Sequence, residues 1–364
     1  MKKIIIASVL LAALMLTAAS CVSRNPGKTD DTTTNLQDIL SQIDSELKNP
    51  ADTMLVNEVL YKVYDDHAEV IGCDTPVGEI KILDEYDGKK VTVIADEAFN
   101  GMVTITGVVI PEGVTAIGEK AFMGCAQLKN VTLPSTLKSI GRYAFYGCSE
   151  LDSIGLPVAL TEIGTNAFGS CTKLSKVEVA AENSAFAAVD GVLFSADKAT
   201  LVYYPTGRAD KSYTIPESVK TVSDFAFAYA VSLESVSMTG VTSLGDYTFR
   251  SCEHLKEVDL GTGLTFLGAS TFQKCTALTE IVIPEGVVSI GYIEDSNECG
   301  ATFCDCTALA TITLPSSLRN VYLRCFDGCT ALSRVNYNGT ADGWKAVVIG
   351  EQNSPLTEAG IVTK

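Results

Sequence analysis

The sequence is poor in the residues and motifs on which catalysis usually depends. Its 364 residues include two histidines, His67 and His254, and one tryptophan. No G-x-S-x-G nucleophile elbow, P-loop, H-E-x-x-H or dinucleotide-binding pattern occurs, which argues against the enzyme classes that these motifs mark. Cys252 precedes His254 by two residues, but an inward-facing Cys252 with a solvent-facing His254 is favoured over a catalytic dyad. We therefore expect no enzyme, no catalytic residue and no cofactor.

Positive charge is also scarce. The chain has 27 Lys and Arg against 44 Asp and Glu, a net charge of −17, and no cluster of basic residues offsets this. Such a chain repels nucleic acids and anionic lipid head groups. Nucleic acid is therefore not expected as a partner.

The long hydrophobic run is confined to the N-terminus. Lys2 and Lys3 precede the apolar stretch 4–16, and the small residues 18–20 follow, as in a secretory signal peptide. A transmembrane helix is the alternative, but the run is short for the ~20 residues that a span needs. Cys21 directly after Ala-Ser resembles a bacterial lipobox, with Ala18 where Leu is more usual. The resemblance implies cleavage before Cys21 and its acylation as a lipid anchor; plain secretion is the other possibility.

What the sequence has in abundance is one repeat, clearest as CAQLKNVTLPSTLKSIGRYAFYG at 125–147. Its Phe position recurs every 23 residues and then, after a slip in phase, continues towards the C-terminus. These positions are Phe99, Phe122, Phe145, Phe168, Phe227, Phe249, Phe272, Phe303 and Phe326. Self-similarity at this period is typical of a solenoid, in which each repeat buries its apolar face against its neighbours.

The order of residues within the repeat predicts its local structure. The segment 128–133 indicates a short strand that Pro134 ends, because proline cannot donate to a strand ladder. A second apolar pair at 137–140 follows, and 143–145 suggests a single helical or 3₁₀ turn that inserts Phe145 into the core. The expected fold is a β-rich α/β solenoid: a right-handed coil of short parallel strands with short helical or 3₁₀ turns.

Most of the twelve cysteines favour a buried column over disulfides. Seven of them share one position of the repeat: Cys125, Cys148, Cys171, Cys252, Cys275, Cys306 and Cys329. Free cysteine behaves as a small apolar residue in a core, and a column along a solenoid cannot close a tetrahedral metal site. Cys325 occupies the Ala position of the repeat, and Cys73 stands alone; both are expected to be buried. No metal site is expected.

The repeat and its interruptions divide the chain. Residues 1–20 are the predicted signal peptide and 21–34 a flexible tether, followed by an N-terminal helix and β-rich cap at 35–90. The solenoid covers 91–337, with a β-hairpin insertion at about 181–215 and a loop insertion at 292–300. The remaining 338–364 form a C-terminal cap, in which Thr340 is a good N-cap for a closing helix that carries Trp344.

The repeat pattern C-x-x-L-x-x-V-x-[LI]-P-x-x-L-x-x-I-G-x-x-A-F-x-G resembles the BspA-type, or treponemal-type, leucine-rich repeat of bacterial surface proteins. The insertion DGVLFSADKATLVYYPTGRADKSYTIPESV and the terminal Tyr337-Asn338-Gly339-Thr340 with Trp344 are similar to segments of that family. The resemblance covers about residues 90–348. It implies a leucine-rich-repeat solenoid and, for some members, adhesion at the cell surface and binding of host matrix proteins. Val222-Ser223 and Val321-Tyr322 depart from the Ile-Gly of the pattern.

The outward positions of the first strand of each repeat form a candidate protein-binding face. One row consists of Val109, Thr132, Gly155, Glu178, Ser237, Asp259, Val282, Thr313 and Asn336. The neighbouring row consists of Gly107, Asn130, Ser153, Lys176, Ser235, Glu257, Glu280, Thr311 and Arg334. The face is small, polar and mildly acidic, without aromatic platforms for sugars or bases. Such side chains suit a protein partner, and they are equally what a crowded parallel ladder tolerates.

Two insertions offer further candidates. The loop residues Glu294, Asp295, Asn297 and Glu298 could bind Ca²⁺, but the EF-hand spacing is absent and a solvated acidic loop is the favoured alternative. Cys299 and an exposed Cys304 could form a disulfide at the base of this loop. In the hairpin, Phe194, Tyr203 and Tyr204 could form a contact patch or pack onto the solenoid.

These observations predict a lipid-anchored protein of the bacterial envelope, on the outer-membrane surface or in the periplasm, that binds a host matrix or envelope protein. Its contact with the membrane is through lipidated Cys21 only. The alternative is an architectural or self-associating envelope protein without a host ligand.

Overall fold

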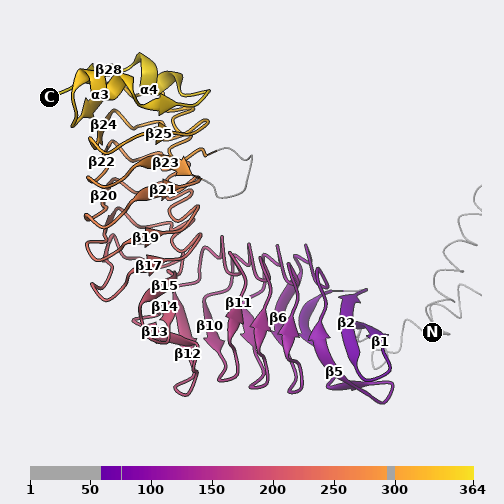
Figure 1. Ribbon diagram of the computed structural model, residues 1–364. Helices are drawn as coiled ribbons and strands as arrows, with labels where there is room; N and C mark the ends of the chain where they lie inside the picture. The colour runs from indigo at the N-terminus through magenta and orange to yellow at the C-terminus, as the bar shows by residue number, and fades with distance from the viewer. Residues whose placement is uncertain (1–58, 75, 293–299) are drawn as a thin grey trace, which may run out of the picture. The chain divides into compact units, whose positions relative to one another are not determined.

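The computed structural model describes residues 59–74, 76–292 and 300–364 (Figure 1). The predicted signal peptide, Cys21, the tether, the helix at 36–47 and the loop at 293–299 lie outside these ranges. The strands are β1 Val59–Val63, β2 Ala68–Cys73, β3 Gly78–Lys81, β4 Glu85–Tyr86, β5 Lys89–Ile94, β6 Ile105–Val109, β7 Ala116–Ile117, β8 Asn130–Thr132, β9 Ser139–Ile140, β10 Ser153–Leu156, β11 Glu162–Ile163, β12 Lys176–Val179, β13 Phe186–Val189, β14 Val192–Ser195, β15 Thr200–Tyr203, β16 Ser212–Thr214, β17 Thr221–Val222, β18 Ser235–Ser237, β19 Ser243–Leu244, β20 Glu257–Asp259, β21 Phe266–Gly268, β22 Glu280–Val282, β23 Ser289–Tyr292, β24 Thr311–Leu314, β25 Asn320–Val321, β26 Arg334–Tyr337, β27 Val348–Ile349 and β28 Gly360–Val362. The helices are α3 Ala341–Lys345 and α4 Ser354–Glu358.

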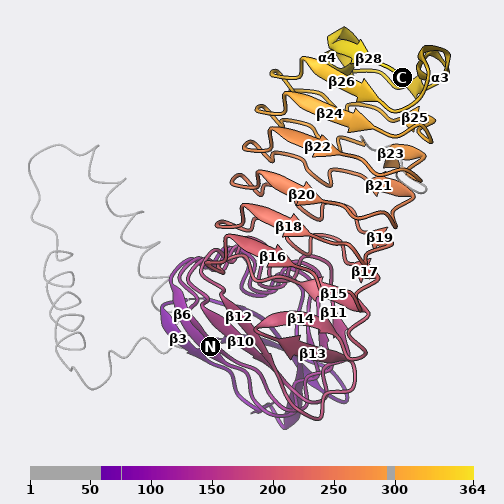
Figure 2. The ribbon, with the colours of Figure 1, turned by 90° about the vertical axis from the view of Figure 1, so that its left-hand side faces the viewer.

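Each repeat forms one coil with two short strands, as the pattern predicts. In the coil that begins at Cys125, β8 and β9 stand on either side of Pro134, and each pairs in parallel with the coil before it: β8 with β6 and β9 with β7. The pairing continues along the chain, so that one column contains β16, β18 and β20 and another β17 and β19 (Figure 2). The solenoid is therefore confirmed.

The phenylalanine of each repeat fills the centre of the coil. The Phe99 and Phe122 rings stack with centroids 4.9 Å apart, Phe122 and Phe145 at 5.2 Å, and the column resumes from Phe227 onward. All nine predicted phenylalanines are at most 2% exposed. Stacking of identical rings and aliphatic side chains between coils supplies the apolar burial that a single coil lacks.

The seven repeat cysteines line this core and form what we call the thiol ladder. Each Sγ donates to the backbone carbonyl of the phenylalanine in the preceding coil, at 3.0–3.2 Å. Burial raises the pKa of Cys125 and of Cys252 to about 12. The predicted inward column is confirmed, and Cys325 and Cys73 are buried as well.

The predicted helical or 3₁₀ turn before the phenylalanine is wrong. The residue two positions before it is left-handed in every coil, as at Lys120 (φ 54°), Tyr143 (φ 56°) and Phe225 (φ 57°). A left-handed residue interrupts any right-handed helical turn. Its N–H instead bonds to the next coil, as Tyr143 N–H does to Thr165 O at 3.2 Å. With two helices of five residues in the described ranges, the α/β label does not fit this β-solenoid.

The segment around 181–215 contains three antiparallel strands. β13 pairs with β14 and β14 with β15, but β15 also pairs in parallel with β17 of the next coil. The three strands thus belong to a sheet of the solenoid. Phe194, Tyr203 and Tyr204 are 1%, 7% and 1% exposed, so the alternative of packing onto the solenoid is correct and the contact patch is not.

The two ends of the described chain differ in their elements. At the N-terminal end β1 and β2 are antiparallel, and β2 joins β5 in parallel. At the other end Thr340 accepts a hydrogen bond from Gly343 N–H and caps α3, as predicted, and the Trp344 ring contacts Tyr337. Within the described residues, neither helix has the length and hydropathy to cross a membrane.

Candidate binding surfaces

The structure brings the two predicted rows of outward residues into register. Asn130 pairs with Gly107, Glu257 with Ser235, and Thr311 with Glu280, and the other row follows two residues later on each strand. We call these rows the strand face. Most of its members are exposed or half-buried, while Gly107 is buried. Parallel pairing holds the backbone beneath them in four successive sheets, β3-β6-β8, β10-β12, β16-β18-β20 and β22-β24-β26-β28, so within each sheet their spacing is that of the strands, about 4.8 Å.

The strand face is hollowed between β16 and β22. A shallow groove of about 570 Å³ is lined there by residues of β16, β18, β20 and β22. Glu257, Asp259 and Glu280 contribute three carboxylates from β20 and β22, and hydroxyls such as that of Ser237 line the neighbouring strand β18. Ser237 Oγ donates to Asp259 Oδ2 at 3.1 Å, and Gly261 N–H donates to Asp259 Oδ1 at 3.0 Å, so this carboxylate is held in place. The groove therefore presents fixed hydrogen-bond acceptors and negative charge.

Other predicted residues of the strand face, on β8, β12, β24 and β26, lie outside this groove. Glu178 pairs with Lys176 at 2.6 Å on β12. Asn336 donates to Thr313 Oγ1 at 3.4 Å across β24 and β26. Thr132 and Asn130 are exposed on β8. The structure thus distributes the predicted residues along the face and gathers six of them, three of which are acidic, in the groove: Ser235, Ser237, Glu257, Asp259, Glu280 and Val282.

The sequence predicts β3 as a strand of the N-terminal cap but not its place in the columns of the strand face, and it does not reveal β16 or β28. β3 precedes β6, β16 precedes β18, and β28 follows β26. Their segments lack the repeat's cysteine and phenylalanine, which is why pattern matching passes over them. Alternation in Ser212-Tyr213-Thr214 is the signal that could have revealed β16, with half-buried Tyr213 pointing towards the core.

The predicted loop site cannot be placed, because Glu294, Asp295, Asn297, Glu298 and Cys299 lie outside the described residues. Cys304 at its base is a free thiol and is 3% exposed, so the expectation of an exposed Cys304 is wrong. Gln273, Arg250 and other turn residues enclose it in a depression of about 300 Å³. Across the described ranges, no group of three His, Cys, Asp or Glu residues is placed to hold a metal ion.

The alternative to a Cys252–His254 dyad is confirmed. Cys252 is fully buried and its Sγ donates to Phe227 O at 3.1 Å, while His254 is exposed. The thiol and the imidazole thus belong to opposite sides of the coil's backbone. A raised thiol pKa also removes the thiolate that nucleophilic catalysis would need.

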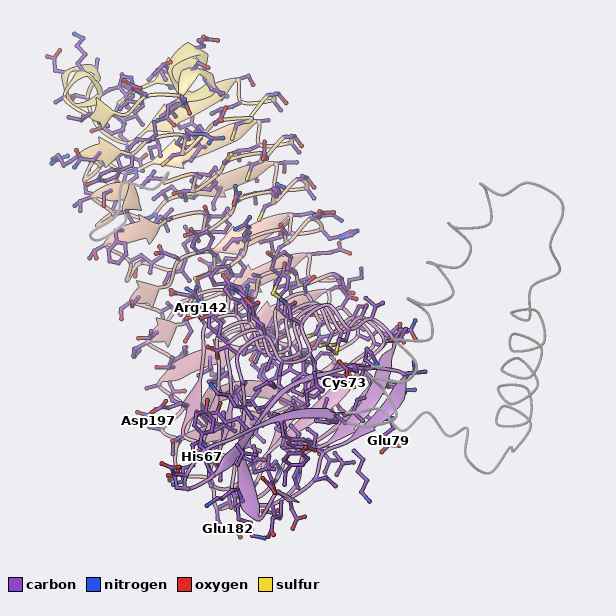
Figure 3. The ribbon with its side chains drawn as sticks, turned by 90° about the vertical axis from the view of Figure 1, so that its right-hand side faces the viewer. His67, Cys73, Glu79, Arg142, Glu182 and Asp197 are labelled. Carbon is purple, nitrogen blue, oxygen red and sulfur yellow. The ribbon has the colours of Figure 1, made fainter. Side chains whose placement is uncertain are left out.

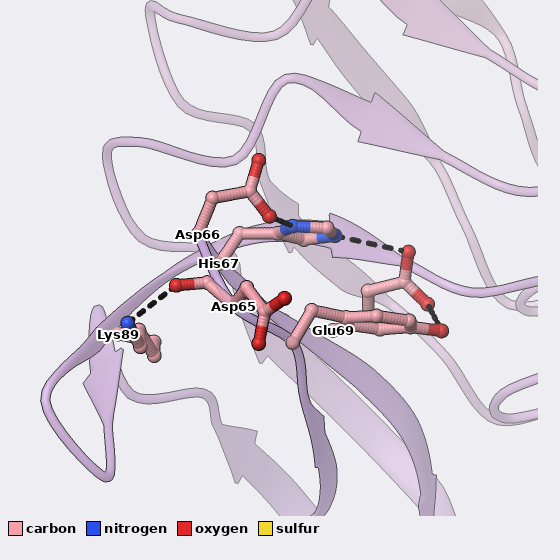
Figure 4. Close-up of polar contacts among 6 residues, drawn as sticks. Asp65, Asp66, His67, Glu69 and Lys89 are labelled. Atoms are coloured by element: carbon pink, nitrogen blue, oxygen red, sulfur yellow. Dashed lines mark hydrogen bonds and ion pairs between the residues drawn. The ribbon is translucent and has the colours of Figure 1, made fainter.

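His67, at the turn between β1 and β2, is the centre of a charged cluster (Figures 3 and 4). Its Nδ1 lies 2.6 Å from Asp66 Oδ1 and its Nε2 3.4 Å from Glu69 Oε1. The imidazole stacks on Tyr64, with centroids 4.7 Å apart. Hydrogen bonds to Asp66 and then to Glu69 raise the pKa of His67. Both ring nitrogens thus contact carboxylates, which indicates that His67 stabilises the turn between β1 and β2.

The turns on the phenylalanine side carry aromatic side chains, which the strand face lacks. Phe225 stacks on Tyr247 with centroids 4.5 Å apart. Tyr146 donates a hydrogen bond to Tyr229 across 83 positions of sequence, at 3.3 Å. Arg142 and Arg250 lie over tyrosine rings nearby in sequence, Tyr143 and Tyr247. These side chains lie on both sides of the point where the sheet that ends at β11 stops and the sheet that contains β15, β17 and β19 takes over.

A parallel β-solenoid of 23-residue coils with exposed polar strand rows defines a leucine-rich-repeat scaffold. The model of the BspA-type leucine-rich-repeat region matches residues 89–194, 208–297 and 299–344 in six copies, well over half of the sequence. The chain belongs to this family. The match indicates a repeat scaffold and no catalytic family.

Solved structures with the same fold come from several bacteria. A leucine-rich cell surface protein of Faecalibacterium prausnitzii is 25% identical, with a TM-score of 0.56 over 81% of this chain and 97% of that one. A leucine-rich repeat protein of Eubacterium ventriosum is 21% identical, with a TM-score of 0.58 over 84% and 95%. The pneumococcal vaccine antigen PcpA is 19% identical, with a TM-score of 0.56 over 85% and 99%. No curated protein matches the sequence.

Proposed function

We propose that the chain is a lipid-anchored protein of the bacterial envelope whose strand face binds a partner protein, with adhesion to a host matrix protein as one form of that activity. Family membership supports the scaffold role. The similar protein of Faecalibacterium prausnitzii is described as a cell surface protein. The signal-like N-terminus with Cys21 supplies the route to the envelope.

The observation that carries the proposal is the register of exposed side chains on the strand face. Each backbone pairing fixes two outward positions per coil, so that a partner meets a rigid, periodic surface with little ordering cost. The groove with Glu257, Asp259 and Glu280 is its concave part. Because these carboxylates stand together, a partner segment with Lys or Arg side chains complements them.

The test is a binding assay with a panel of matrix proteins and with envelope extracts. Partners captured by the full chain are compared with those captured by the triple variant Glu257→Lys, Asp259→Lys, Glu280→Lys. The matched control is Glu182→Lys, Asp342→Lys, Glu358→Lys, which makes the same charge change at exposed sites outside the strand face. We expect the groove variant to lose at least tenfold in affinity, and the control to lose little.

Light scattering distinguishes self-association. If the chain forms concentration-dependent oligomers that the groove variant abolishes, and neither panel yields a partner, the architectural role replaces the proposed one. Equal binding by the groove and control variants would place the interface elsewhere on the molecule.

A further inference from the structure

Within the described residues the solenoid contains one shortened turn, in the coil of β15, which lies between the fourth coil, that of Phe168, and the coil of β17. In the coil at 222–227, five positions separate Val222 from Phe227. In the preceding coil Leu201 pairs with Val222 and the Tyr204 ring stacks on Phe227, but only three positions separate Leu201 from Tyr204. Two residues are therefore missing from this turn, and the left-handed position that stands two residues before each of the nine phenylalanines is among them.

A cleft occupies the place of the missing residues. It measures about 400 Å³. One wall is the turn of the fourth coil, including Asn166 and Phe168, and the other is the turn that contains Asp224 and Phe225. Val202 and Tyr203 of the shortened coil form its floor. Tyr203 is fixed there by its hydroxyl, which donates to Phe168 O at 2.9 Å.

One wall of the cleft carries a backbone donor and the other a backbone acceptor, and neither has a backbone partner in the described part of the chain. Elsewhere, the N–H of the left-handed residue donates to the next coil, as Lys120 N–H does to Arg142 O at 2.9 Å and Phe225 N–H to Asp246 O at 3.0 Å. Within the described ranges, Asn166 N–H has no such acceptor and Asp224 C=O no such donor. Backbone groups without an intramolecular partner favour a ligand that satisfies both.

In a regular coil this pair of bonds is completed by a single peptide group. The peptide group between Arg142 and Tyr143 accepts from Lys120 N–H through its C=O and donates to Thr165 O through its N–H. A trans peptide group points its C=O and N–H in opposite directions, so it bridges a donor on one side and an acceptor on the other. In a regular stack, two turns with one turn missing between them are separated by two strand spacings, about 9.6 Å. This distance leaves room for one extended peptide segment.

We propose that this cleft is a binding site for an extended peptide segment of a partner protein, one peptide group of which bridges Asn166 N–H and Asp224 C=O. This is addition of a backbone segment to an open ladder, with affinity from main-chain hydrogen bonds and specificity from side chains. The peptide residue that follows the bridging group then occupies the place of the missing left-handed residue, next to Phe225. An aromatic side chain there extends the Phe225–Tyr247 stack, and the exposed Asp224 carboxylate favours a basic side chain before it.

The site is separate from the strand face, and its test is independent of the proposed function. The probe is the blocked tetrapeptide acetyl-Gly-Arg-Tyr-Ala-amide, the sequence that completes the regular turn at 141–144. Its binding to the full chain is followed by saturation-transfer NMR. A matched peptide with an N-methyl group on the tyrosine nitrogen lacks the donor to Asp224 C=O. We expect saturable binding of the first peptide and at least fivefold weaker binding of the second.

Two variants place the binding at the cleft. Phe225→Gly keeps the left-handed backbone and removes the aromatic wall, and we expect it to weaken binding about tenfold. Lys120→Gly makes the same change at the same position of a complete turn and should leave binding unchanged. Insertion of Asp-Phe after Val202 restores the turn length and should abolish binding, with the thermal transition showing that the chain still folds.

Several outcomes overturn the proposal. These are no saturable binding at about 5 mM peptide, equal binding of the N-methylated peptide, or equal binding by the Phe225→Gly variant. Binding of a neutral oligosaccharide such as cellotetraose that Phe225→Gly abolishes, without peptide binding, would assign the cleft to sugars instead.

Discussion

The thiol ladder shows how one residue type can satisfy two needs of a stacked coil. Each cysteine side chain is small enough for the core, and its Sγ donates a second hydrogen bond to a phenylalanine carbonyl that already accepts a backbone N–H, as Phe122 O does from Cys125 N–H at 3.2 Å. The thiolate is the reactive form of cysteine, and burial raises the pKa of these thiols. Reactivity is therefore suppressed by the same packing that buries them.

We predict that Cys125, Cys148 and Cys252 in the native chain resist a maleimide reagent at pH 8, and that all three react once urea unfolds the chain. Mass spectrometry of tryptic peptides measures the labelling at each position. Unfolding restores the pKa to its usual value near 8.5, so a large increase in rate is expected. Rapid labelling of these residues in the folded chain would contradict the ladder.

The carboxylates around His67 give a second prediction at this scale. Because its pKa is raised in the folded chain, the cluster stabilises the β1–β2 turn fully below the unfolded pKa of about 6.5. This stabilisation is lost as pH rises through the higher folded value. NMR titration should give His67 a midpoint above 6.5, and Asp66→Asn should lower it. A midpoint that Asp66→Asn leaves unchanged would show that Asp66 is not the main cause.

At the scale of the element, the close approach of coils depends on glycine after the second strand. A Cβ at Gly141 would lie 2.5 Å from the carbonyl carbon of Gly118, and one at Gly164 would lie 2.3 Å from the backbone nitrogen of Arg142. Where the pattern departs from Ile-Gly, the preceding coil is itself altered. Ser223 follows the shortened turn at 201–204, and Tyr322 follows the coil with the loop insertion.

We predict that Gly141→Ala destabilises the chain strongly, by about 2–4 kcal/mol, because the backbones of two coils must separate. Gly155→Ala is the matched control: no atom lies within 4 Å of its Cβ position, so the change should be neutral or slightly stabilising. Thermal unfolding followed by circular dichroism compares the two. Equal transition temperatures would show that the coils tolerate the wider spacing.

How much of the fold and of the binding sites the sequence predicts depends on the repeat. Leu, Val, Phe and Cys at fixed spacing determine the coil, its two strands and the inward columns. The prediction of a helical turn before Phe145 is wrong because Tyr-Ala-Phe contains no residue that marks a left-handed backbone, whereas Tyr143 is left-handed and its N–H bonds to the next coil. The open pair at Asn166 and Asp224 depends on which turns are neighbours in space. Sequence spacing alone does not reveal it.

At the scale of the whole molecule, each coil pairs its strands with the neighbouring coils, so stability is largely local. The Tyr146–Tyr229 hydrogen bond, which spans two intervening coils, is an exception. Function then depends on where the solenoid is presented. Residues 1–58 lie outside the described part, and the strand face and the cleft both belong to the part from Val56 onward. Presentation at a membrane therefore rests on the proposed acylation of Cys21, which can be tested apart from any ligand.

We predict that the full chain incorporates a labelled fatty acid and fractionates with membranes when it is expressed in a bacterial host, because acylation adds about 0.8 kcal/mol of membrane affinity per buried methylene. Cys21→Ser should abolish the label and release the chain from the membrane fraction. Cys73→Ser, a change at a buried thiol, should retain both. Protease treatment of intact cells then shows whether the anchored chain faces outward, where a matrix protein could reach it. A Cys21→Ser variant that keeps the label would refute the lipid anchor and leave the N-terminus as an ordinary secretion signal.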